Sequence, residues 1–531
     1  MSAETTNATV PTAPSLDRRA LVKGAAALAT AGLVGSETAR AAVAAQAVPA
    51  IAAQPLPVPT PAAQTQTQTQ SQTQAQLMPG APTAFAARPP KAQRRFTSPA
   101  VEAEIARVSA MIADPKLRAM FAACYPNTLD TTVGLGLANG RVDAFVITGD
   151  IPCMWLRDSS AQLLSYVHLV RKDAQLATLF RGAIARQARS VLLDPYANAF
   201  MRDATAKTNL PWALQDQTEM KTGVAERKWE VDSLCWTMRL AYRYWQASGD
   251  AAPFDGIWVA AQQAIVRTFR EQQRKDGRGP YSFRRSSDRP TETLGLDGYS
   301  APTRPVGLIH SGFRPSDDAC LYPFLIPANH FAVTTLREMA LVAERAAGNA
   351  ALAAEARALA DEVAAALLKW GTMRLPDGRQ VWAYEVDGFG NAVFMDDANV
   401  PSLLGLAYAG CVPADDPLWL ATADACWSDA NPYFFKGTAI EGIGGPHVGL
   451  GQVWPMSLIV RALSSSDPAV IAPLLRHLRD TDAGTGFMHE AVDCNNPAQF
   501  TRSWFAWANG LFGEMIVGLA DRLPAVLANP L

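Results

Sequence analysis

A helix–turn–helix pattern over residues 334–370 is the feature that most constrains the fold of this chain. Apolar side chains recur there at i, i+3, i+4 and i+7, which is the spacing of one face of an α-helix. The pattern breaks at Gly348-Asn349, two residues that are typical of helix ends and turns. The segment therefore predicts two long antiparallel helices. Similar patterns occur at 99–113, 160–171, 176–193, 231–247, 256–274, 454–464, 468–480 and 503–522.

So many helical patterns with few strand-like runs favour an all-α fold, in which helical hairpins close into a ring, or toroid. The clearest strand signal is at 381–386, which turns at 387–390 into 391–394 and predicts a small β-hairpin insertion between helices. In a ring of hairpins we expect the chemistry to gather where the connecting loops meet at one end.

Composition divides the chain into three parts. All 13 Trp lie at or after Trp155, whereas residues 49–93 are rich in Pro, Ala, Gln and Thr and include a Gln/Thr tract at 64–76. Such a stretch has too little apolar surface to offset the entropy of ordering it. We therefore predict a disordered spacer at 46–95 and a single large globular domain at 96–531, after a targeting segment at 1–45.

The targeting segment has the order of features that a twin-arginine export signal requires. Arg18-Arg19 precede a weakly apolar run, and Ala39-Arg40-Ala41 form a small-x-small cleavage site. The alternative is an Ala-rich amphipathic helix that begins the fold. The signal predicts export to a bacterial periplasm or secretion.

Charge and cysteine usage exclude several classes of function. The chain has 47 basic and 49 acidic residues, and a net charge of -2 gives no electrostatic reason to bind nucleic acid. The apolar run at 25–34 is about half the length that spans a bilayer, so we expect no membrane span after signal removal. The seven Cys form no CxxC pair, and the six His are scattered without an HExxH motif. We expect no metal and no cofactor.

The first motif that can carry chemistry is GDIPCMWLRDSS at 149–160. The guanidinium of Arg157 offers several N–H donors beside the two acceptor oxygens of the Asp158 carboxylate, a combination that binds vicinal sugar hydroxyls. Trp155 can stack on a pyranose ring. The equally plausible structural alternative is an Arg-Asp ion pair with a core Trp and an Asp helix cap.

The second motif is HSGFRPSDDA at 310–319, which contains Arg314, Asp317 and Asp318. Two adjacent carboxyls can raise one another's pKa, which a general acid working near neutrality needs. The more frequent explanation for such a pair is capping of a following helix, here predicted over the apolar run at 320–327.

The third motif combines GFMHEA at 486–491 with FTRSWFAWAN at 500–509. Glu490, with Arg502 and two Trp nearby in sequence, is a candidate base in an aromatic pocket; the alternative is a Glu paired with Arg502. Three candidates are weaker. Asp232 begins a helix and is as much a helix cap as a ligand-binding group, and Asp396-Asp397 precede another predicted helix. The third is a Gly-rich loop at 442–449. That loop lacks the preceding strand and the Lys of a phosphate loop, so we interpret it as bringing His447 to a ligand.

Together these clusters resemble glycoside hydrolase family 125, the inverting exo-α-1,6-mannosidases. The matching stretches are GDIPCMWLRDS, WEVDSLCW, SGFRPSDDAC with FLIPANHFA, MDDANVPSLL, GIGGPHVG, and GFMHEA with FTRSWFAWANGLF. The resemblance spans about 149–514 and implies an (α/α)6 barrel and metal-independent hydrolysis of terminal non-reducing α-1,6-linked mannose.

Carried over by motif, the resemblance makes Asp317, rather than Asp318, the catalytic acid and Glu490 the catalytic base. An inverting enzyme needs its two carboxyls roughly 6.5 to 9.5 Å apart, with room for a water, so the fold must bring these distant residues together. The expected substrate-binding residues are Trp155, Arg157, Asp158, Asp232, Arg314, Asp318, His447 and Arg502.

The expected partner is an α-mannoside oligosaccharide derived from mannan or an N-glycan, and we expect a monomer. Two alternatives stay open on the sequence alone. One is another (α/α)6 inverting glycosidase, such as a glucosidase, because the pocket residues suit several hexoses. The other is a non-catalytic periplasmic glycan-binding protein, which the Trp content and export signal also fit.

Overall fold

The computed structural model describes residues 88–529. The predicted signal at 1–45 lies outside the described residues, as does the predicted spacer up to residue 87. The last eight residues assigned to the spacer are described and contact the domain. Arg88, for example, pairs with Asp130 and Glu102, each at 2.8 Å.

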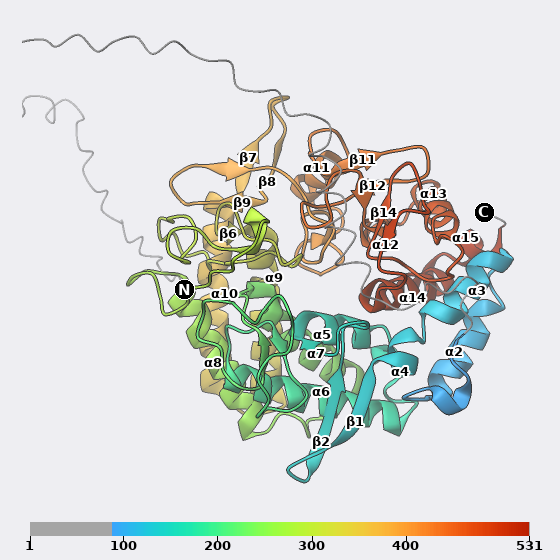
Figure 1. Ribbon diagram of the computed structural model, residues 1–531, viewed down its shortest axis with the longest axis horizontal. Helices are drawn as coiled ribbons and strands as arrows, with labels where there is room; N and C mark the ends of the chain where they lie inside the picture. The colour runs from blue at the N-terminus through green and yellow to red at the C-terminus, as the bar shows by residue number, and fades with distance from the viewer. Residues whose placement is uncertain (1–87, 530–531) are drawn as a thin grey trace, which may run out of the picture. The chain divides into compact units, whose positions relative to one another are not determined.

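The described residues form an all-α domain with small sheets (Figure 1). Its α-helices are α2 (Pro99–Ser109), α3 (Pro115–Cys124), α4 (Asn127–Thr131), α5 (Leu156–Leu164), α6 (Ala174–Leu193), α7 (Val231–Ser248), α8 (Gly256–Gln272), α9 (Ile326–Arg345), α10 (Ala350–Trp370), α11 (Pro417–Cys426), α12 (Pro455–Leu463), α13 (Pro468–Asp480), α14 (Ala506–Arg522) and α15 (Pro524–Ala528). Short 3₁₀ helices are η1 (Lys91–Gln93), η2 (Val167–Leu169), η3 (Pro290–Glu292) and η4 (Leu404–Leu406).

Six elements form a closed inner ring, in the order α5, α7, α9, η4, α12 and α14, and each contacts the next. The ring closes where α14 meets α5, with Ser165 Oγ donating to Gly510 O at 2.9 Å. Outside them lie α6, α8, α10, α11, α13 and α3, each against an inner element. This arrangement is the predicted (α/α)6 barrel. Near the closure α2 and α3, from the start of the described chain, lie beside α14 and α15 from its end (Figure 1).

The predicted helical hairpin at 334–370 is confirmed as α9 and α10. Gly348 adopts a positive φ of 64°, and the Asn349 side chain accepts a hydrogen bond from Leu352 N at 3.0 Å, capping α10. The buried face of α10 repeats at helical spacing, through residues that include Leu352, Ala356, Leu359 and Val363. Helix α9 begins earlier than the pattern indicated, at Ile326.

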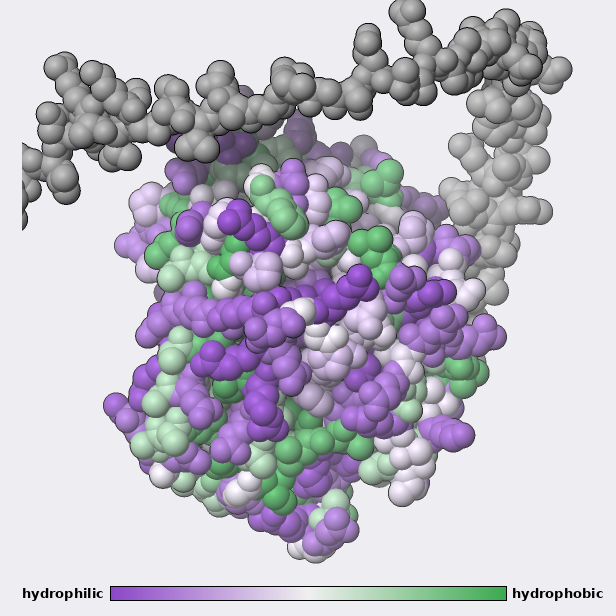
Figure 2. Space-filling model, turned by 90° about the vertical axis from the view of Figure 1, so that its left-hand side faces the viewer, coloured by the Kyte–Doolittle hydropathy of each residue, from purple (hydrophilic) through white to green (hydrophobic). Residues whose placement is uncertain are grey.

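The interior of the barrel is filled by aromatic rings from facing inner helices. Trp236 of α7 contacts Phe331 of α9 and Trp507 of α14 edge-to-face, with ring centroids 5.1 and 6.1 Å apart. These rings make the barrel a packed core beneath the loops at its end. On the outer face that Figure 2 shows, hydrophilic side chains cover most of the surface with smaller apolar patches between them.

Short strands form small sheets, several of which lead directly into inner helices. The strands are β1 (Val133–Ala138), β2 (Arg141–Val146), β3 (Met154–Trp155), β4 (Ala199–Phe200), β5 (Val224–Glu226), β6 (Phe324–Leu325), β7 (Thr372–Arg374), β8 (Gln380–Trp382), β9 (Glu385–Val386), β10 (Ala392–Val393), β11 (Phe434–Lys436), β12 (Glu441–Ile443), β13 (Gln452–Val453), β14 (Ala491–Asp493) and β15 (Phe500–Thr501). Sheets β3-β4-β5, β10-β9-β6 and β13-β14-β15 have three strands, and the others are antiparallel pairs. Strands β3 and β6 run straight into α5 and α9, and only Trp454 separates β13 from α12, so the sheets fix where these helices begin.

Two local predictions are only partly right. The predicted hairpin is present, because β9 pairs antiparallel with β10 across the turn at 387–390. Its first arm is not one strand over 381–386, because that segment pairs with β7 through β8 and then changes partner to β10 and β6 through β9. The apolar run at 320–327 is not a helix throughout. Pro323 lacks an N–H and disfavours helical geometry before it, and Phe324–Leu325 pair with β9, so the helix begins only at Ile326.

All seven cysteines lie among the described residues and none is paired. Across residues 88–529, no helix is both long enough and apolar enough to cross a membrane.

Candidate active site

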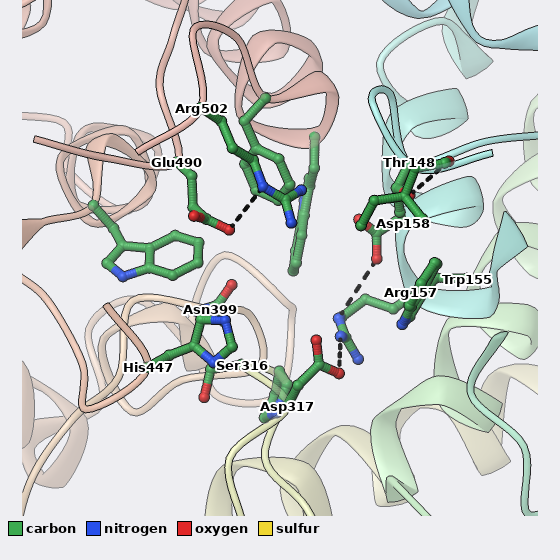
Figure 3. A pocket seen from close by; sticks show the side chains of 15 residues that line it. Thr148, Trp155, Arg157, Asp158, Ser316, Asp317, Asn399, His447, Glu490 and Arg502 are labelled. Carbon is green, nitrogen blue, oxygen red and sulfur yellow. Dashed lines mark hydrogen bonds and ion pairs between the residues drawn. The ribbon is translucent and has the colours of Figure 1, made fainter. Parts of the chain in front are cut away.

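A cavity of about 420 Å³ lies at the end of the barrel where inner helices begin (Figure 3). Trp155, Trp454 and Phe505, which line it, immediately precede the first residues of α5, α12 and α14. The full lining is Thr148, Ile151, Trp155, Arg157, Asp158, Pro315, Ser316, Asp317, Asn399, His447, Trp454, Glu490, Arg502, Phe505 and Trp507. Seven of these are residues that the sequence motifs predicted, from segments far apart in the chain.

The predicted residues that line the cavity are Trp155, Arg157, Asp158, Asp317, His447, Glu490 and Arg502. The other three lie behind its wall. Asp232 and Asp318 are almost fully buried, beneath Arg157 and His447 respectively. Arg314 pairs with Glu385 at 2.6 Å and lines a separate cavity of about 1270 Å³.

Asp317 is held at the tip of a tight loop. Its N–H donates to Arg314 O at 2.9 Å, so residues 314–317 form a β-turn with Pro315 in its second position. The N–H of Arg314 donates to Asp318 O at 2.8 Å. The φ of Asp317 is 70°, a left-handed conformation that Asp tolerates, and Lys228 Nζ donates to its carbonyl at 2.8 Å. The loop thus directs the Asp317 carboxylate into the cavity, with 28% of the side chain exposed.

Arg157 joins four carboxyl groups beneath this loop. Its Nη1 lies 2.5 Å from Glu230 Oε2 and 3.3 Å from Asp232 Oδ2, and its Nη2 lies 3.5 Å from Asp317 Oδ1. Its Nε lies 3.8 Å from Asp158 Oδ2. The ion pair that was the structural alternative for this motif therefore exists, and it forms part of the cavity wall.

Burial controls the protonation of these carboxyls. It raises the pKa of Asp158 and of Asp232 to about 6, against the opposing charge of Arg157. It raises the pKa of Glu230 well above the usual range. Burial also acts to raise the pKa of Asp317, but the charges of Arg157 and Lys228 and a hydrogen bond from Glu230 outweigh it and lower that pKa.

Glu490 faces the cavity from a different side (Figure 3). Arg502 Nε lies 3.3 Å from Glu490 Oε1, and Arg502 Nη1 lies 3.3 Å from Asp150 Oδ1. The pairing of β14 with β15 places the two segments together, and the ring of His489 stacks on Phe500 with centroids 3.9 Å apart. The Glu490–Arg502 pair, which was the alternative to a catalytic role, thus fixes the carboxylate at the cavity surface.

His447 forms the wall between the two carboxylates. Burial acts to lower its pKa, but its pairing with Asp318, at 3.6 Å between Nδ1 and Oδ1, and the charges of Glu490 and Asp317 raise the pKa to about 9. Asp318 therefore contacts an imidazolium, and it does not cap a helix. The Gly-rich loop before His447 packs closely against the 396–397 segment, since a Cβ on Gly445 would lie 3.2 Å from Asp397 Oδ2.

Sequence reasoning missed several groups at the site. Glu230 and Asn198 lie behind Asp317, with Asn198 Nδ2 3.3 Å from Glu230 Oε1 and 3.4 Å from Asp317 Oδ1. Glu230 lies two residues before Asp232 in the WEVDSLCW motif. Its position at the start of a predicted helix was the signal that could have marked it as a site residue. Nothing in the sequence around Asn198 marks it. Asn399 lines the cavity from the segment that begins with Asp396-Asp397.

The arrangement can perform acid–base chemistry on a neutral ligand. Two carboxylates face one cavity from separate loops, backed by Arg157 and Arg502, and Trp155, Trp454 and Trp507 supply apolar surface for a sugar ring. Within residues 88–529, no group of three or more His, Cys, Asp or Glu is placed to hold a metal ion.

Comparison with known proteins identifies relatives over most of the domain. The chain is 43% identical over 457 residues to the meiotically up-regulated gene 157 protein of Schizosaccharomyces pombe, covering 83% of this chain and 89% of the relative. It is also similar to the solved structure of a metal-independent α-mannosidase of Streptococcus pneumoniae, in a non-productive substrate complex with α-1,6-mannobiose. That match has 38% identity and a TM-score of 0.77, and it covers 80% of this chain and 99% of the other. Residues 114–517 match the family described as metal-independent alpha-mannosidase (GH125), and the chain therefore belongs to that family.

Proposed function

We propose that this protein is an exo-acting, inverting glycoside hydrolase that removes terminal non-reducing α-1,6-linked mannose. The observation that carries the proposal is that Asp317 and Glu490 face one cavity of about 420 Å³. The α-1,6-mannobiose complex of the Streptococcus pneumoniae relative supports the linkage.

In the proposed mechanism Asp317 is the general acid. It protonates the glycosidic oxygen as the bond to the anomeric carbon breaks, so that the leaving sugar departs as an alcohol. Its place at the tip of the 314–318 turn brings the carboxyl to the cavity while the backbone stays fixed by Lys228 and Arg314. Asp318, which is turned away toward His447, does not reach the cavity.

Glu490 is the general base. It takes a proton from a water that attacks the anomeric carbon from the face opposite the leaving group, which inverts the configuration. The ion pair with Arg502 orients the carboxylate, and Arg502 is itself anchored by Asp150. A fixed base lowers the entropic part of the barrier, because the water is held in an attacking position.

The remaining cavity residues are proposed to position the sugar. Arg157, Asp158 and His447 offer donors and acceptors to ring hydroxyls, and Trp155 offers an apolar face. Together they favour a ring distorted toward the oxocarbenium-like transition state. Asp232 and Arg314 act through Arg157 and Glu385, because neither lines the cavity.

A panel of linkage-defined disaccharides tests this function. The purified protein should release mannose from α-1,6-mannobiose faster than from α-1,2- or α-1,3-mannobiose and should leave α-1,6-linked glucobiose intact. Preferential cleavage of the glucoside would identify a glucosidase instead. Tight binding of mannobiose in calorimetry, with no hydrolysis at any pH, would indicate a glycan-binding protein.

The natural substrate is proposed to be a mannan or N-glycan oligosaccharide met outside the cytoplasm. The paired Arg18-Arg19 and the Ala39-Arg40-Ala41 site support export by the twin-arginine pathway. Replacing both arginines with lysine should retain the enzyme in the cytoplasmic fraction, and export unchanged by that replacement would contradict the pathway. The exported protein is proposed to act as a monomer, which size-exclusion chromatography with light scattering tests.

A further inference from the structure

The buried carboxyl of Glu230 lies directly behind the proposed acid. Glu230 Oε2 accepts hydrogen bonds from Arg157 Nη1 at 2.5 Å and from Ser233 Oγ at 2.7 Å. Its other oxygen, Oε1, shares the donor Asn198 Nδ2 with Asp317 Oδ1, at 3.3 and 3.4 Å. Arg157 and Asn198 thus each donate to both carboxyls, and the two carboxyls are also hydrogen-bonded to each other.

Around Glu230 the carboxyls outnumber the cations. Within residues 88–529, Arg157 is the cation that contacts Glu230, and it also contacts Asp232, Asp317 and Asp158. Lys228 donates to the backbone carbonyl of Asp317, and the charges of Lys228 and His447 act on the Asp317 carboxylate. A buried group of carboxyls with so few counter-charges retains a proton, because ionising all of them would leave uncompensated charge in a low dielectric.

The two facing carboxyls differ in their access to water. The side chain of Glu230 is completely buried, whereas that of Asp317 is 28% exposed in the cavity. Burial penalises the ionised form, so in the free enzyme the shared proton resides on Glu230 and Asp317 is the anion. The pKa directions of the two groups agree with this assignment, raised for Glu230 and lowered for Asp317.

We propose that Glu230 stores the proton that Asp317 delivers to the glycosidic oxygen. This inference rests on the proposed function. A sugar in the cavity excludes water from Asp317, and the ionised form of Asp317 is then no longer favoured over that of Glu230. The proton therefore moves from Glu230 Oε1 to Asp317 Oδ1. Asp317 then gives a proton to the leaving oxygen as the C–O bond breaks, while Glu490 removes one from the attacking water. Solvent takes the proton from Glu490 and later returns one to the Glu230–Asp317 pair.

The position of Glu230 in the fold suits a group that must release a proton and regain it. It is the residue before the first turn of α7, where the helix N-terminus stabilises negative charge. Arg157 Nη1 and Ser233 Oγ both donate to Oε2, which leaves Oε1 to carry the proton. The other titratable groups that act on Glu230 include Asp232, in that first turn, and the buried phenol of Tyr281, while Glu226 shares the donor Asn198 Nδ2 with it. Glu230 touches no substrate and is therefore a positioning residue.

The test compares a substrate that needs the acid with one that does not. In Glu230→Gln, kcat/KM for α-1,6-mannobiose should fall about 100-fold or more, because its leaving group must be protonated. For α-mannosyl fluoride, which leaves as fluoride ion without an acid, kcat/KM should stay within about threefold of wild type. The alkaline limb of the mannobiose pH profile should also move to lower pH, since the glutamine amide donates to Asp317 and favours its ionised form.

Two further variants separate this role from a structural one. Glu226→Gln alters another buried carboxylate that accepts from Asn198, at 3.0 Å, without contacting Asp317, and it should affect both substrates alike. Glu230→Asp keeps a titrating carboxyl and should restore part of the mannobiose activity and the alkaline limb. It also serves as the informative variant if Glu230→Gln does not fold.

Equal losses on both substrates in a folded Glu230 variant, or an unchanged mannobiose rate in Glu230→Gln, would overturn the inference. A wild-type enzyme that cleaves neither substrate would instead overturn the proposed function.

Discussion

The pairing of His447 with Asp318 makes a measurable prediction about stability and pH. The pKa of His447 is raised from 6.5 to about 9, with its Nδ1 3.6 Å from Asp318 Oδ1. A raised pKa means that the folded state binds the proton more tightly than the unfolded state. The stabilisation is therefore fully present below pH 6.5 and is lost as the pH rises through about 9.

The size of this stabilisation follows from the difference between the two pKa values of His447. The difference between 6.5 and about 9 corresponds to roughly 3 kcal/mol. Because 26% of the His447 side chain is exposed, solvent screening reduces this, and we expect about 2 kcal/mol. Asp318→Asn should thus lower the free energy of unfolding by about 2 kcal/mol at pH 6, and the difference from wild type should vanish or reverse near pH 10.

Urea unfolding followed by tryptophan fluorescence at both pH values measures this difference. A double-mutant cycle with His447→Asn isolates the pair from other titrating groups, and we expect a coupling of about 2 kcal/mol at pH 6. An equal loss of stability in Asp318→Asn at both pH values would refute the reasoning. So would a coupling that does not depend on pH. Asp318→Asn should also keep measurable mannosidase activity, because Asp318 is not the proposed acid.

Four other predictions concern the reaction and the fold. Asp317→Asn and Glu490→Gln should each reduce turnover of α-1,6-mannobiose by about 100-fold or more with an unchanged circular dichroism spectrum; full activity in either would remove that residue from its role. Proton NMR should show β-mannose as the first product, and an initial α-anomer would contradict inversion. Activity should survive dialysis against EDTA, whereas a loss that zinc or calcium restores would contradict metal independence. Gly513→Ala should cost about 1–3 kcal/mol in urea unfolding, because a Cβ there would lie 2.5 Å from Tyr125 Cδ2, and an unchanged midpoint would show that the α14 contact is looser.

The sequence predicted the barrel because its helices carry their own signal. The spacing of Leu352, Ala356 and Val363 along α10 is the spacing of its buried face. Sequence patterns failed to predict the structure where tertiary contacts determine the length of an element or the partner of a strand. Element η4 holds the fourth inner position as only a single short turn, and at 381–386 the strand partners change at Ala383-Tyr384. Local periodicity carries no information about either.

The sequence motifs predicted which segments form the candidate site, but they did not predict which side chains face the cavity. Asp317 and Asp318 are adjacent and chemically identical. In the 314–318 turn Asp317 has a left-handed φ and its carbonyl accepts from distant Lys228, and one carboxyl lies at the cavity while the other pairs with His447. Glu230 lay inside a recognised motif, yet its role depends on Asn198, a residue from another loop. Such relations arise only when the loops assemble.

The barrel itself explains why an acid-rich site is tolerated at this end. Inner helices α5, α7, α12 and α14 all begin there, and in none of them does the side chain of the N-cap residue accept from the first turn. The first N–H of α7 donates to Ser311 Oγ and that of α5 to Asn198 O. The N-termini of these helices supply partial positive charge to the same small region. Asp158 and Asp232 lie in the first turns of α5 and α7, where this field favours their carboxylates. The parallel inner helices thereby offset part of the cost of burying several carboxyls around one arginine, and an acid and a base can operate in one closed cavity.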